Sequence, residues 1–166
     1  MKNKKINIMK QRLLIQNKTL LRLLRARGAV LFLLTLLLTS CEIKPEPINY
    51  GKDMCVFCSM TLIDKKFGAE IINSKGKVLK FDSGECMLQF LKADKEFKPS
   101  KFLITDYENP GELIDAEKAW YLFGGNIKSP MGGRLAGFKT LEAAEKTQKE
   151  LSGDLLLWDK VRVLNF

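Results

Sequence analysis

The stretch DMCVFCSM, residues 53–60, concentrates side chains that could do chemistry. It holds Cys55 and Cys58 at CxxC spacing, with Met54 and Met60 on either side, and the chain contains no histidine. Two thiols at this spacing suit a redox dithiol, one half of a zinc site, a disulfide, or a site for a soft metal ion such as Cu(I).

Zinc and thioredoxin-like redox chemistry fit these residues less well than a soft metal does. The chain has four cysteines, of which Cys41 ends a predicted lipoprotein leader, so three thiols remain where a structural zinc site takes four strong ligands. A redox CxxC has its attacking thiol at the start of a helix, but the residues after Cys58 lead into a predicted strand. A disulfide within CxxC closes a small loop and adds little stability.

The methionines favour a soft metal. Thioethers and thiolates together select Cu(I) over harder ions. Met54 and Met60 flank the cysteine pair, and Met131 stands on a Pro–Met–Gly turn, where a core side chain is not expected. Met87 and Cys86 fall on a predicted helix with an apolar face, so both are interpreted as core residues rather than ligands.

Residues 1–40 have the pattern of a bacterial export signal. A basic segment precedes the apolar run AVLFLLTLLL at residues 29–38, which is too short to span a bilayer as a helix. The run ends in LTSC, which resembles the lipobox of bacterial lipoproteins and predicts lipidation at Cys41. Residues 41–52 contain two prolines and are predicted to form a tether, and residues 53–166 are predicted to form the folded domain.

The distribution of charge argues against a nucleic-acid partner. Residues 1–40 hold nine Lys/Arg and no acidic residue, and this segment accounts for the whole excess of 28 basic over 19 acidic residues. The remainder is formally neutral and has no basic footprint for phosphate groups. The expected location is extracytoplasmic, on a membrane, through the lipid on Cys41. In a Gram-negative cell, Glu42 in place of Asp favours the outer membrane, facing the periplasm.

The hydrophobic pattern predicts an α+β fold. A helix is expected at 84–93, capped by Asp82 or Ser83. Strands are expected at residues 67–73, 77–81, 101–105, 119–123 and 154–158. Residues 76–91 can be laid over residues 133–148, which matches Phe81 with Phe138, Ser83 with Thr140 and Glu85 with Glu142. This repeat of strand, polar cap and helix predicts two ββαβ units packed together.

The combined motifs resemble the NosL family. A lipobox is followed by CxxCxM, then by KVLKFDSGECMLQF and by SPMGGRLAGF, and the similarity covers most of the chain. The resemblance implies an exported copper-binding lipoprotein of two ββαβ units, related in fold to organomercurial lyase. It implies Cys55, Cys58, Met60 and Met131 as Cu(I) ligands, with Met54 as an additional candidate because it lies beside Cys55.

The resemblance also implies a function and partners. Members of the family assist the maturation of nitrous oxide reductase by delivering Cu(I), together with a membrane ABC-type complex. The chain departs from the family pattern at Ser59, where a glycine usually precedes the methionine.

We therefore expect a lipid-anchored Cu(I) metallochaperone. We do not expect an enzyme, because the sequence shows no acid–base groups arranged around a metal. The absence of histidine also excludes a catalytic triad. Two alternatives stay open: a thiol–disulfide oxidoreductase that uses Cys55 and Cys58, and a structural lipoprotein with a Cys55–Cys58 disulfide.

Overall fold

Four antiparallel strands form the first sheet of the computed structural model, which describes residues 44–166. In chain order they are β1 (Ala69–Asn73), β2 (Val78–Phe81), β3 (Pro99–Thr105) and β4 (Leu113–Asp115), and they lie in the order β2-β1-β3-β4. The sequence does not predict β4, because its three residues show too little periodicity to identify a strand.

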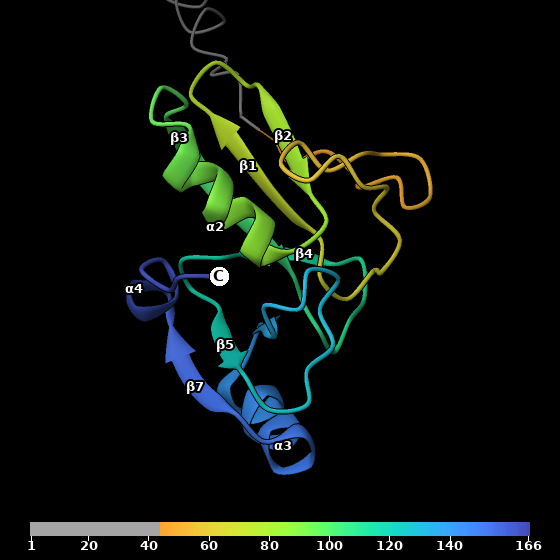
Figure 1. The fold of residues 1–166 in the computed structure, drawn as a ribbon, viewed down its shortest axis with the longest axis vertical. Coiled ribbons are helices and arrows are strands. Elements are labelled where there is room, and N and C mark those ends of the chain that lie inside the picture. The colour runs from red at the N-terminus through yellow and green to blue at the C-terminus, as the bar shows by residue number, and fades with distance from the viewer. Residues whose placement is uncertain (1–43) are drawn as a thin grey trace, which may run out of the picture. The chain divides into compact units, whose positions relative to one another are not determined.

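The second sheet has three antiparallel strands, β5 (Trp120–Phe123), β6 (Leu135–Phe138) and β7 (Asp154–Leu157), in the order β6-β5-β7. In both units the first strand lies between the second strand and the strand that follows the helix. This shared order confirms the predicted α+β fold of two ββαβ units (Figure 1). A short helix that the sequence does not predict, α4 (Trp158–Val161), follows β7.

Each unit contains a helix that begins after a hydroxyl cap. Ser83 precedes α2 (Gly84–Ala93), and Thr140 precedes α3 (Leu141–Leu151). Each hydroxyl accepts a hydrogen bond from the amide three residues further along the chain. Such a cap satisfies one of the amides that the first helical turn leaves without a partner. The predicted equivalence of Ser83 and Thr140 is confirmed, and Ser83 rather than Asp82 is the cap of α2.

A shared core joins the two units. Its buried side chains come from both sheets and include Phe81, Tyr121 and Leu135. Ile104 of β3 packs against Gly137 of β6, where an added Cβ atom would lie 2.9 Å from the Ile104 side chain. The two sheets can approach this closely only because the residue at position 137 is glycine.

The segment before the CxxC loop is part of the folded unit. The amide of Glu46 donates to Glu70 Oε1 at 3.2 Å, and Tyr50 Oη lies 3.3 Å from a hydroxyl of β3. Ile48 and Tyr50 also pack against the main core. These contacts attach the segment from Glu46 onward to the domain.

Two expectations concern parts of the chain outside residues 44–166. The predicted export signal at residues 1–40 and the predicted lipidation of Cys41 both lie outside the described residues. Within residues 44–166, no helix is long and apolar enough to cross a membrane.

Glu70 contributes to the dependence of the fold's stability on pH. Its side chain is fully buried in β1, and burial raises the pKa of this carboxyl to about 7. The folded protein therefore keeps a proton that the unfolded chain loses near pH 4.5, so the free energy of unfolding falls as pH rises from 4.5 to 7. This group lowers the free energy of unfolding by at most about 1.4 kcal/mol per pH unit.

We predict that Glu70→Gln flattens this dependence, because the amide is neutral at every pH and its oxygen still accepts from Glu46. Urea denaturation at about pH 5 and about pH 8 should show that the free energy of unfolding of the variant, relative to that of the wild type, increases as pH rises. Asp82, whose pKa burial raises to about 6, contributes equally to both proteins and cancels in the comparison. Parallel stability curves for the two proteins would contradict the prediction.

Candidate metal centre

A tight loop presents the cysteine pair. Residues 53–62 turn back on themselves, with the amide of Cys55 donating to the carbonyl of Met60 at 2.8 Å. The amide of Val56 donates to the carbonyl of Lys80 at 3.0 Å, which attaches the loop to β2. Backbone hydrogen bonds therefore hold the two cysteines beside the strand that leads into α2.

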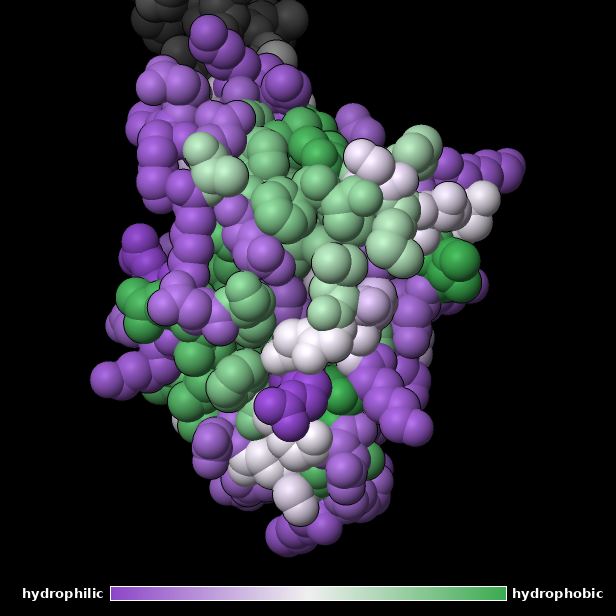
Figure 2. Space-filling model, in the orientation of Figure 1, coloured by the Kyte–Doolittle hydropathy of each residue, from purple (hydrophilic) through white to green (hydrophobic). Residues whose placement is uncertain are grey.

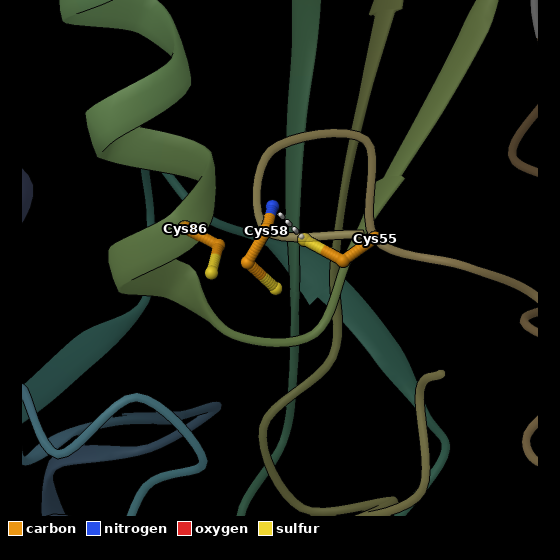
Figure 3. Close-up of side chains that lie close together, drawn as sticks. All are labelled: Cys55, Cys58 and Cys86. Carbon is orange, nitrogen blue, oxygen red and sulfur yellow. Dashed lines mark hydrogen bonds between the residues drawn. The ribbon is translucent and has the colours of Figure 1, made fainter. Parts of the chain in front are cut away.

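The first turn of α2 brings a third thiol to this loop. The Sγ atoms of Cys55, Cys58 and Cys86 lie within 4.8 Å of one another. Figure 3 shows the three side chains gathered in one place, two from the loop and one from the helix. The amide of Cys58 also donates to Cys55 Sγ at 3.5 Å.

The membership of Cys86 in this cluster is not predicted from the sequence. Its side chain is 0% exposed, as expected of a core residue, but it also faces the sulfur atoms of the CxxC loop. The signal in the sequence was a third cysteine in the first turn of a helix. Spacing alone could not show that this turn lies against residues 55–58, because the contact depends on how the loop pairs with β2.

Burial and hydrogen bonding distinguish the three thiols. Cys55 and Cys86 are buried, and Cys58 is partly exposed. A hydrogen bond from the Cys86 thiol lowers the pKa of Cys55 to about 5, and backbone amides near Cys55 add to this effect. The same hydrogen bond raises the pKa of Cys86, and burial raises the pKa of Cys58. These shifts favour the thiolate form of Cys55 and the thiol forms of Cys58 and Cys86.

The geometry of the cluster suits a soft cation. Three thiolates that surround a metal in a plane, with metal–sulfur bonds of about 2.3 Å, place their sulfur atoms about 4 Å apart. The observed separations, all within 4.8 Å, need only small side-chain rotations to reach this arrangement. A structural zinc site would take a fourth strong ligand, and the chain has no histidine to supply it.

Comparison with known proteins identifies the family of this chain. The sequence profile of the NosL family matches residues 48–163, a range that includes all three clustered cysteines. The chain belongs to the NosL family. The prediction of the family from the sequence motifs is confirmed.

Two NosL proteins resemble this one. The copper-binding lipoprotein NosL of Stutzerimonas stutzeri is 32% identical over 117 residues, which make up 65% of this chain and 60% of that protein. This chain thus spans about three-fifths of the length of that curated relative. The crystal structure of the copper chaperone NosL from Shewanella denitrificans matches with a TM-score of 0.61 at 22% identity, over 72% of this chain and 96% of that one. Both names describe copper proteins, and neither describes an enzyme.

The three candidate methionine ligands of this NosL protein lie at its surface. Met54, Met60 and Met131 are 60%, 50% and 40% exposed, whereas Met87 is 1% exposed in the core, as predicted. Figure 2 shows an apolar area on the face that carries α2, with hydrophilic residues around it. The structure therefore leaves three thioethers accessible and buries the fourth methionine of the described domain.

Ser59 departs from the usual NosL pattern at a strained backbone position. Its φ is 62°, in the left-handed region that favours glycine. The amide of Ser59 donates to the carbonyl of Cys55 at 2.9 Å, so this conformation closes the turn that contains the cysteine pair. A side chain in this region costs about 1–2 kcal/mol, which glycine at this position would avoid.

We predict that Ser59→Gly raises the free energy of unfolding by about 0.5–1 kcal/mol, because relief of the strain exceeds the extra entropy of glycine in the unfolded chain. Urea denaturation of the metal-free protein measures the change. Ser74→Gly is the matched control, since Ser74 is an exposed turn residue without a positive φ, and this variant should be less stable than wild type. A destabilised Ser59→Gly protein would contradict the prediction.

Proposed function

We propose that this NosL protein is a metallochaperone that binds Cu(I) at Cys55, Cys58 and Cys86 and delivers it to a copper enzyme. The observation that supports this most directly is the grouping of the three sulfur atoms within 4.8 Å. Met60 and Met131, and Met54 as an additional candidate, would supply thioether ligands at the open side of the cluster. The names of the two NosL relatives, which describe copper binding and copper chaperoning, support the same cargo.

The proposed oxidation state follows from the donor atoms. Thiolate and thioether sulfur are soft ligands that stabilise Cu(I), whereas Cu(II) prefers nitrogen and oxygen in tetragonal arrangements. The chain offers no imidazole, and three free thiols lie together in the described part of the chain. Binding would displace the protons of Cys58 and Cys86 and leave the oxidation state of the ion unchanged.

The exposure of the ligands supports transfer by ligand exchange. Cys58 is the partly exposed member of the cluster, and the loop around it carries accessible side chains that include Met54, Phe57 and Met60. A ligand from a partner protein could reach the metal from this side and form its bond before the bonds to Cys55 and Cys86 break. The exposed apolar residues beside the cysteines would give that partner an apolar contact surface.

The proposed location is extracytoplasmic. The predicted export signal at residues 1–40 and the lipobox cysteine Cys41 would place a lipid at the start of the mature protein. In a Gram-negative cell the anchor would lie in the outer membrane and face the periplasm. The name of the Stutzerimonas stutzeri relative, a lipoprotein, supports this assignment.

Nitrous oxide reductase is the proposed recipient of the copper, with an ABC-type maturation complex as a further partner. This part of the proposal rests on the family resemblance. A nitrous oxide reductase gene beside the gene for this protein would support the assignment. Its absence from the whole genome would exclude this enzyme as the client and leave Cu(I) binding untouched.

Two features argue against a thiol–disulfide oxidoreductase. The lowered pKa of Cys55 is typical of a reactive thiol, but this side chain is only 2% exposed, which restricts access to a disulfide substrate. The CxxC pair also lies on a loop, and the cysteine at a helix start is Cys86. Cys55 and Cys58 are not joined by a disulfide in the structure, so both thiols are available to a metal ion.

We predict that the reduced full-length protein, purified in detergent, holds Cu(I) in competition with bathocuproine. Cys58→Ser should abolish this binding, and Cys86→Ser should weaken it by at least about tenfold, about 1.4 kcal/mol, because each removes one of three sulfur ligands. Met87→Leu is the matched control, since Met87 follows Cys86 on α2 but points into the core.

Three outcomes of this titration would oppose the proposal. Wild-type protein that binds no Cu(I) but reduces insulin disulfides would establish the oxidoreductase alternative. Unchanged affinity in Cys86→Ser would remove Cys86 from the site and leave the CxxC pair. Equal losses in Met87→Leu and Cys86→Ser would show that disturbance of α2, rather than loss of a ligand, causes the effect.

A further inference from the structure

Glu85 is a buried acidic residue in the first turn of α2, next to Cys86. Its side chain is 0% exposed. Its Oε1 atom accepts hydrogen bonds from the hydroxyl of Ser129 and from the amide of Leu135, the latter at 3.1 Å. Its Oε2 atom has no hydrogen-bond partner among the residues that the structure describes. An unpaired buried carboxylate oxygen destabilises a fold, so its presence calls for an explanation.

Both ends of the loop that carries Met131 meet this carboxylate. The hydroxyl of Ser129 donates to Glu85 and accepts from the amide of Arg134 at 2.9 Å. Gly133 approaches so closely that an added Cβ atom would lie 2.5 Å from Glu85 Cγ. Glu85 therefore closes the base of the loop 129–135, and Met131 lies at its exposed tip.

The second ββαβ unit serves as an internal comparison. Glu142 occupies the place of Glu85 in the repeat, and Ala143 occupies the place of Cys86. Glu142 is exposed, although α3 has the same hydroxyl cap and starts at the matching residue. The ββαβ scaffold therefore does not require a buried carboxylate at this place, and the burial of Glu85 is particular to the unit that carries the sulfur cluster.

We propose that Glu85 is a positioning residue that couples the two halves of the copper site. Through Ser129 and Leu135 it would hold the Met131 loop against the helical turn that carries Cys86, so that a thioether is already placed when the thiolates bind the metal. The inference rests on the proposed Cu(I) binding and on Met131 as a ligand. A loop ordered before binding loses less conformational entropy when it binds, and the affinity is correspondingly higher.

A double-mutant cycle tests this coupling. The full-length protein in detergent is titrated with Cu(I) against bathocuproine for Ser129→Ala, Met131→Ala and the double variant. Met131→Ala should weaken binding by about tenfold, and Ser129→Ala by about threefold to tenfold. Because Ser129 would act only through Met131, the second substitution should add nothing to the first. Copper X-ray absorption should show the loss of one sulfur neighbour in Met131→Ala and in the double variant, but not in Ser129→Ala, which keeps the thioether and loses only its ordering before binding.

Three further variants separate positioning from general stability. Glu85→Ala removes the oxygen that accepts from Ser129 and Leu135, so it should weaken Cu(I) binding as Ser129→Ala does, whereas Glu85→Gln keeps an accepting oxygen and should retain affinity close to wild type. Glu142→Gln, at the equivalent place in the second unit, should leave the affinity unchanged. Thermal unfolding of each metal-free variant measures its loss of stability. If Glu85 acts by positioning alone, the losses of affinity should not follow the losses of stability across the variants.

The outcomes distinguish this inference from the proposed function. Wild-type protein that binds no Cu(I) would remove both. Cu(I) binding that is unchanged in Met131→Ala would overturn the role of Glu85 and leave the three-thiol site intact. Additive losses from Ser129→Ala and Met131→Ala, or a loss in Glu85→Gln as large as that in Ser129→Ala, would also overturn it.

Discussion

The candidate metal centre depends on one attachment, the pairing of the CxxC loop with β2 through the amide of Val56 and the carbonyl of Lys80. β2 ends at Phe81 and α2 begins at Gly84, so the same strand that holds the loop also leads into the helix that carries Cys86. The three thiols meet because the CxxC loop and α2 are both attached to this short stretch of backbone. A loop free of β2 would bring together only the CxxC pair.

Duplication of the ββαβ unit explains the scaffold, and differences between the copies explain the site. Both units have the same strand order and the same type of helix cap, and Ile104 against Gly137 helps to close the core between them. Glycine at that contact lets the sheets approach. The cysteines, and the buried carboxylate of Glu85, belong to the first unit, while the second unit contributes the Met131 loop. The proposed site would therefore draw on residues of both copies.

Burial varies across the site in a way that suits a protein that must hold copper and then release it. The buried thiols of Cys55 and Cys86 favour retention, because little solvent reaches them, and the partly exposed Cys58 gives access. The methionines at the surface, which are proposed as additional ligands, would bind more weakly, and a partner could displace them. A fully closed site would bind copper but would offer a partner no route to it.

The sequence by itself determined the fold class, the helix at 84–93 and the repeat, because periodicity and cap residues are local properties. It also identified the NosL family and the CxxC pair. Only the tertiary structure brought Cys86 to that pair, showed that the segment from Glu46 is held by the domain, and placed Glu85 beneath the Met131 loop. These features join residues far apart in the chain, and no local pattern records which strand a loop pairs with or which buried atoms meet.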